Sequence, residues 1–174
     1  MKAVTNRKLF SAITEMESFI QTLTKIEDLD GGWSTKYRDD ETGLYWLKYV
    51  VEDKACLEDL MLISPPPTTD DLIEIAFTSN YPDEVLAAAR RLSIEEQVDK
   101  KEYRQKLNNR LDQIKIALLD KSERERLRTI AQSAQLTDRV NKREVLGKQL
   151  LEIQKDAQFF EVIADRAQEI INRL

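Results

Sequence analysis

The stretch that decides the predicted fold is WSTKYRDDETGLYWLKYVVE, residues 33–52. Two runs of aromatic and β-branched residues flank an acidic segment that ends in Gly43. Such runs favour strands, and a short polar turn containing glycine joins the two strands of a hairpin. We therefore expect a β-hairpin here. Because an isolated hairpin is only marginally stable in water, it must pack against other elements.

The rest of the chain predicts helices, because glycine and proline number only four each and helix-forming residues are abundant. Apolar residues three and four positions apart predict a helix over 8–28, and a short apolar run predicts another over 56–63. Capping signals predict further helix starts near Thr69, Pro82, Ser93, Ser122 and Asn141. The clearest helical stripe consists of Phe159, Phe160, Ile163, Ala164, Ala167, Ile170, Ile171 and Leu174.

The predicted fold class is mainly α: a helical bundle or a short HEAT-like α–α array, with one β-hairpin near residues 33–52. A length of 174 residues suits a single domain, 1–174. Within it, residues 1–64 hold the first helix and the hairpin, and residues 68–174 hold the other helices. The three prolines at 65–67 form a stiff connector between these parts.

Catalytic, cofactor and metal sites are not expected. The chain has no histidine and a single cysteine, Cys56, which we expect to be a buried, inert thiol. The lack of histidine removes catalytic triads, histidine acid–base chemistry and the usual zinc ligands. No glycine-rich phosphate loop is present either. We therefore expect a binding protein rather than an enzyme.

Charge is unevenly distributed along the chain. Residues 1–99 contain 10 Lys+Arg and 20 Asp+Glu, a net charge of −10, whereas residues 100–174 contain 17 and 12, a net charge of +5. An acidic surface in the first part would attract a basic protein partner. The alternative is that the two parts neutralise each other in the fold.

The candidate partner-binding residues lie on the hairpin and at two helix starts. They are Tyr37, Asp39, Asp40, Glu41, Tyr45, Asp70, Asp71, Asp83 and Glu84. The acidic residues also have a purely structural explanation, because acidic side chains are favoured in the first turn of a helix and in polar turns. The aromatic residues of the hairpin could likewise line the core.

The basic residues between 100 and 143 are the best case for nucleic-acid binding. Glutamates interleave with them at spacings that form ion pairs along a helix. No aromatic or helix-turn-helix signature accompanies them. Nucleic acid is therefore an unlikely partner, and a solvated helix face is the simpler interpretation.

Two segments carry a resemblance to known families. Residues 70–77 and 81–92 resemble a HEAT-like unit of two antiparallel helices, with alanines at Ala87, Ala88 and Ala89. Together with Gly32–Trp33 and the segment 39–46, this pattern is similar to bacterial polymorphic-toxin immunity proteins of HEAT-like helical type. The resemblance implies an inhibitor that binds and neutralises a cognate toxin domain.

The expected location is the cytoplasm, because the N-terminus lacks the apolar region of a secretory signal and no apolar run reaches the length of a membrane span. We expect no membrane partner, and the sequence leaves the oligomeric state open. The alternative function is a structural or adaptor module that uses helix faces for protein assembly.

Overall fold

The structure is a computed structural model that describes residues 6–52 and 57–174. Within these residues it contains a five-stranded antiparallel sheet and six α-helices, so the fold is α+β. The prediction of a mainly α fold with one hairpin is therefore wrong. Cys56 lies outside the described residues, and its predicted burial is not addressed by the structure.

The sheet has the strand order β1-β5-β4-β3-β2. Its strands are β1 (Leu9–Phe10), β2 (Thr24–Leu29), β3 (Ser34–Arg38), β4 (Tyr45–Glu52) and β5 (Leu57–Leu62). The predicted hairpin at 33–52 is present as β3 and β4, with Tyr37 opposite Trp46. It forms the middle of the sheet, because β2 pairs with β3 on one side and β5 pairs with β4 on the other.

Two segments predicted as helices contain strands instead over part or most of their length. The helix expected over 8–28 is only α1 (Ile13–Ile20), with β1 before it and β2 after it. The helix expected over 56–63 is replaced by β5. Short apolar runs fit either a buried strand or a helix, and here pairing with neighbouring strands decides the outcome.

The remaining helices are α2 (Thr69–Thr78), α3 (Pro82–Asp99), α4 (Arg104–Asp112), α5 (Lys121–Ser133) and α6 (Leu150–Arg173). Single 3-10 turns lie at η1 (Asp30–Gly32) and η2 (Ile116–Leu118). The predicted starts of α2 and α3 are confirmed, since Thr68 caps α2 and Pro82 is the first residue of α3. The stripe predicted for 159–174 is also confirmed, because six of its eight side chains are buried: Phe160, Ile163, Ala164, Ala167, Ile170 and Leu174.

Three predicted helix starts differ from the structure. No new helix begins at Ser93, because α3 runs through it and Glu95 and Glu96 are buried ion-pair partners. The capping box of α5 uses Asp120 and Glu123, two residues before the predicted one. Asn141 caps no helix, and residues 134–149 connect α5 to α6 without helix or strand.

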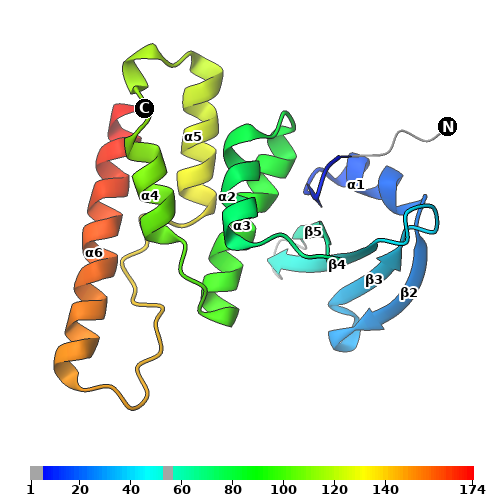
Figure 1. Ribbon diagram of the computed structural model, residues 1–174, viewed down its shortest axis with the longest axis horizontal. Coiled ribbons are helices and arrows are strands. Elements are labelled where there is room, and N and C mark those ends of the chain that lie inside the picture. Colours follow the sequence, from blue (N-terminus) through cyan, green and yellow to red (C-terminus); the bar gives the residue numbers. More distant parts are fainter. Residues whose placement is uncertain (1–5, 53–56) are drawn as a thin grey trace.

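The two faces of the sheet pack against different helices, as the alternation of side chains along β5 shows. Leu60 and Leu62 join Phe10 and Trp46 in a core cluster with α1. Met61 points the other way, into the main core formed with the helices of the second half of the chain. Figure 1 shows the resulting arrangement, with the sheet at one end of the long axis and α6 at the other. Among the described residues, no helix is both long and apolar enough to cross a membrane.

Candidate functional site

The outer strands of the sheet extend away from the helical part of the molecule. In Figure 1, β2 and β3 form the end of the molecule opposite α6. The side chains of β2 are exposed from Thr24 to Asp28, and that of Leu29 is half-buried. Two large apolar side chains on this hairpin are also exposed, Ile26 at 43% and Trp33 at 52%. A strand that buries none of its side chains contributes little to the core, and its surface is free to contact another molecule.

This outer hairpin, which we define as residues 24–43, is acidic. It contains six Asp and Glu residues and three Lys and Arg residues, a net charge of −3. Each cation pairs with one carboxylate: Lys25 with Asp28 at 2.7 Å, Lys36 with Glu27 at 3.4 Å and Arg38 with Asp40 at 2.5 Å. Within the described part of the chain, the other three acids, Asp30, Asp39 and Glu41, form no ion pair. The outer hairpin therefore offers a surplus of three carboxylates to a basic partner.

Three acidic residues were predicted at the turn: Asp39, Asp40 and Glu41. The side chains of Asp39 and Asp40 form hydrogen bonds that stabilise the turn, and the side chain of Glu41 does not. The Asp39 carboxylate accepts hydrogen bonds from the Glu41 backbone N–H at 3.0 Å and from the Thr42 hydroxyl at 2.8 Å. Hydrogen bonds from Thr24 on β2 and then from Arg38 lower the pKa of Asp40. Glu41 is exposed at the tip. Asp39 and Asp40 thus hold the turn together while keeping their negative charge at the surface.

The two predicted tyrosines are both half-buried. Tyr37 packs against the cluster of Phe10 and Trp46, and the Tyr45 ring lies 5.1 Å from the Lys36 ammonium. The most accessible aromatic side chain of the outer hairpin is Trp33, which was not among the predicted site residues. The sequence feature that could have indicated its exposure is the preceding pair Gly31–Gly32. Both glycines have a positive φ, and they form the turn that leads into β3.

The predicted acids at the start of α2 remain at the surface. Asp71 forms a reciprocal capping box with Thr68, and hydrogen bonds from Thr68 lower the pKa of Asp71. Asp70 pairs with Lys106 of α4 at 2.8 Å, with both side chains largely exposed. An exposed pair of this kind contributes at most about 1 kcal/mol, so Asp70 can exchange Lys106 for another cation at little cost.

Asp83 and Glu84, at the start of α3, are occupied within the molecule. Glu84 is buried and accepts hydrogen bonds from the backbone N–H groups of Lys8 at 2.7 Å and Leu9 at 3.2 Å. Burial would raise the pKa of Asp83, but hydrogen bonds from the Ser11 and Ala12 backbone and from Arg7 outweigh it and lower that pKa. These two carboxylates anchor β1 to α3. They are not part of the binding surface proposed below.

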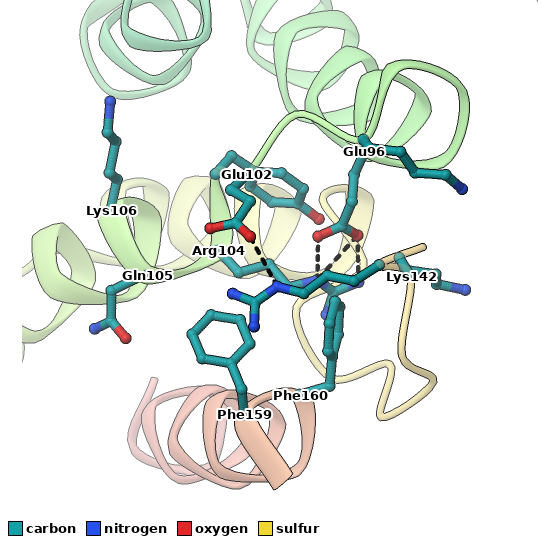
Figure 2. Close-up of a pocket in the computed structure, with 11 residues that line it drawn as sticks. Glu96, Glu102, Arg104, Gln105, Lys106, Lys142, Phe159 and Phe160 are labelled. Carbon is teal, nitrogen blue, oxygen red and sulfur yellow. Dashed lines mark hydrogen bonds and ion pairs between the residues drawn. The ribbon is translucent and has the colours of Figure 1, made fainter. Parts of the chain in front are cut away.

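A pocket of about 220 Å³ lies between the end of α3, the start of α4, the loop before α6 and α6 itself. Figure 2 shows Arg104 and Glu96 joined in this pocket, with Phe159 and Phe160 beside them. The buried Arg104 guanidinium binds both Glu96 oxygens, with distances of 2.8 to 3.0 Å, and donates to the Asp138 carbonyl at 2.9 Å. Its cationic group is therefore already neutralised inside the protein.

Two further cations of the pocket, Arg143 and Lys142, are also occupied. Arg143 bridges Glu102 and Asp156, at 2.7 Å to each, and its guanidinium lies 4.3 Å from the centre of the Phe159 ring. Lys142 pairs with Asp138 at 2.7 Å. Because Arg104, Arg143 and Lys142 already have carboxylate partners, these three positive charges offer little net attraction to an anion. Their main effect is to hold the loop before α6 against the helices.

Other cations of the basic stretch predicted at 100–143 also have partners within the fold. Arg110 binds Glu74 at 2.6 Å, and Arg126 donates to the carbonyl oxygens of Phe77 and Ser79 at 2.9 and 2.6 Å. These contacts use the cations to join α4 and α5 to α2. Phosphate binding requires exposed cations, so Arg110 and Arg126, which are held by these contacts, are poorly placed to bind a phosphate.

No three Asp, Glu, Cys or His side chains in residues 6–52 and 57–174 converge so as to hold a metal ion. Comparison with known proteins finds no matching family model, no matching curated protein and no matching solved structure.

Proposed function

We propose that this chain is a protein-binding inhibitor that recognises a basic partner with the outer hairpin, residues 24–43. The observation that supports this most directly is that β2 buries none of its side chains, while its surroundings carry a net charge of −3. Excess negative charge accelerates encounter with a basic protein and orients it.

The exposed side chain of Trp33 is the proposed anchor of the interface. Tryptophan is enriched among the few residues that dominate binding energy at protein interfaces. Trp33 is 52% exposed and lies three residues after the exposed Asp30. An apolar side chain and a carboxylate without an ion-pair partner are therefore close together in the chain. A basic partner with an apolar depression would bury the indole and pair with the carboxylates.

The more specific proposal is an immunity protein that neutralises a bacterial toxin domain. It rests on the resemblance of residues 39–46 and of the helix pair to such proteins, and the antiparallel packing of α2 and α3 is compatible with it. In this role the chain acts by stoichiometric binding and occlusion, so it requires no catalytic group of its own.

Co-expression with the product of the neighbouring gene tests the proposal. The unmodified chain is expected to bind that product in a one-to-one complex and to relieve its toxicity. Trp33→Ala and Glu41→Lys should each weaken binding at least tenfold when measured by calorimetry, because they remove the anchor or reverse an uncompensated charge. Glu161→Lys reverses another exposed acid, on α6, and serves as the control. Equal weakening by all three variants, or the lack of any complex, would contradict the proposal.

A further inference from the structure

Asp59 lies where the sheet meets α3, and its side chain is completely buried. Side chains alternate between the two faces of a strand, so Asp59 lies on the same face of β5 as Met61, which belongs to the main core. Opposite Asp59 on β4 is Tyr49, another member of that core. A carboxylate at such a position has lost its water, and this loss favours the neutral form of the group.

The charge of Asp59 has few partners. An ionised carboxylate can accept about four hydrogen bonds. The Oδ1 atom of Asp59 accepts one from Arg90 at 3.3 Å, whereas Oδ2 has no hydrogen-bond partner. The Arg90 guanidinium is shared, because its Nη2 atom donates to the Ser11 hydroxyl at 2.9 Å. Arg90 therefore compensates the buried carboxylate only in part.

The other buried carboxylates of residues 6–52 and 57–174 are better satisfied. Both oxygens accept hydrogen bonds in each of Glu84, Glu95, Glu96 and Asp156. Asp59 is thus the one buried carboxylate in this part of the chain with an oxygen that no donor reaches. A protonated oxygen needs no donor, because it carries a hydrogen of its own. The surroundings of Asp59 therefore suit a carboxylic acid better than a carboxylate.

The charges near Asp59 do not reverse this preference. The charged and titratable groups of the elements packed against it are Arg90, Arg91, Asp83 and Glu84 of α3, Tyr49 of β4, and Arg7 and Lys8 before β1. Each charged member of this set other than Arg90 is occupied by another partner. Burial raises the pKa of Asp59; the Arg90 charge and the Ser11 hydroxyl lower it by less, and the Asp83 charge raises it further.

We propose that packing of the sheet against α3 is coupled to the uptake of one proton by Asp59, so that mild acid strengthens this junction. The proton comes from solvent and binds at Oδ2, the oxygen without a donor. Its binding removes a negative charge from the core. Arg90 then loses a counter-charge, but it keeps the Ser11 hydroxyl and is 17% exposed, so its own charge remains partly hydrated.

Proton uptake makes the stability of the junction depend on pH in a defined direction. The unfolded chain holds Asp59 with the pKa of an ordinary aspartate. Between that value and the higher pKa of the folded chain, the folded chain binds more protons, so stability falls as the pH rises. Asp83 has the opposite effect, because its pKa is lowered in the folded chain and its contribution is lost as the pH falls. The junction is therefore strongest below the pKa of Asp59 and above that of Asp83.

Nuclear magnetic resonance titration of the side-chain carboxyl carbons measures the proton binding directly in the unmodified, carbon-13-labelled chain. The signals are assigned through bonds from the backbone, so no variant is needed. Asp59 is expected to titrate above the ordinary aspartate pKa of about 3.9, and Asp83 below it. A midpoint for Asp59 at or below the ordinary value would overturn the proposal.

Urea unfolding between about pH 3 and about pH 8 measures the coupling to stability. Asparagine takes up no proton in this range, so the unfolding constant of the unmodified chain relative to Asp59→Asn should rise with pH. The expected rise is about tenfold for each unit by which folding raises the pKa of Asp59. Relative to Asp83→Asn, the unfolding constant of the unmodified chain should instead fall as the pH rises.

Glu58→Gln is the matched control. Glu58 is the neighbouring carboxylate on β5, but it lies on the opposite face of the sheet and pairs with Lys48 at 2.5 Å. An equal change in pH dependence for Glu58→Gln and Asp59→Asn, or no change for Asp59→Asn, would overturn the proposal. None of these variants alters the outer hairpin, so proton uptake can fail while partner binding by the hairpin succeeds, and the reverse also holds.

Discussion

Arg104 illustrates how one side chain determines the position of a whole loop. Its guanidinium is almost completely buried and is held by Glu96 and by backbone carbonyls of the chain that leads to α6. A buried ion pair has a large desolvation cost, so its net contribution to stability is modest, but the removal of one partner leaves an uncompensated charge in the core. The Arg104–Glu96 pair is important because it fixes the position of the loop that leads to α6.

We predict that Glu96→Gln lowers the free energy of unfolding by about 3 kcal/mol, because Arg104 would remain buried without a counter-charge. Glu102→Gln, in the more exposed pair with Arg143, should lower it by less than about 1 kcal/mol. Urea unfolding of both variants measures the difference. Equal losses would show that burial does not distinguish the two carboxylates.

At the scale of the element, β2 and β5 have opposite roles although both were predicted as helix. β5 lies inside the sheet with Leu60 completely buried, whereas β2 forms the edge and carries a bulge between Lys25 and Glu27. Charged side chains and bulges at an edge strand prevent uncontrolled pairing with other chains. This edge is therefore suited to contact through its side chains rather than by strand addition.

We predict that Leu60→Ala lowers the free energy of unfolding by about 2–5 kcal/mol, because it removes buried methyl groups and leaves a cavity. Ile26→Ala on β2 should cost less than about 1 kcal/mol, because Ile26 is 43% exposed. Chemical denaturation measures both values. A large loss from Ile26→Ala would mean that β2 stabilises the monomer and is less available for a partner.

At the scale of the whole molecule, one core connects the sheet to the helices. The main cluster contains Leu9 and Met61 from the sheet together with Ile130 of α5 and Ala167 of α6. Helix α3 lies between these parts, in contact with both β1 and α5. The outer hairpin and α6 are therefore placed at opposite ends of one continuous body.

We predict that the chain unfolds in a single cooperative transition. Both tryptophans belong to the sheet part, so tryptophan fluorescence reports on the sheet, whereas far-ultraviolet circular dichroism is dominated by α3, α5 and α6. A shared core requires the two transitions to coincide in urea. Two separate midpoints would instead indicate that the sheet and the helices unfold as independent units.

Local sequence patterns correctly predicted the hairpin at 33–52, the first residues of α2 and α3, and the buried stripe of α6. Each of these depends on neighbours in the chain: alternating aromatic residues around Gly43, Thr68 beside Asp71, and apolar residues at helical spacing. Local signals of this kind are visible in a single sequence because the interactions that produce them are themselves local.

The other features depend on contacts between distant parts of the chain. Residues 24–29 and 57–62 became strands because β3 and β4 offered hydrogen-bonding edges to them, and such pairing is invisible to local spacing. Asp83 and Glu84 looked like surface acids but bind the backbone of residues 8–12, more than seventy positions away in the chain. The exposure of Trp33 likewise depended on where the core ended, which only packing of the whole chain determines.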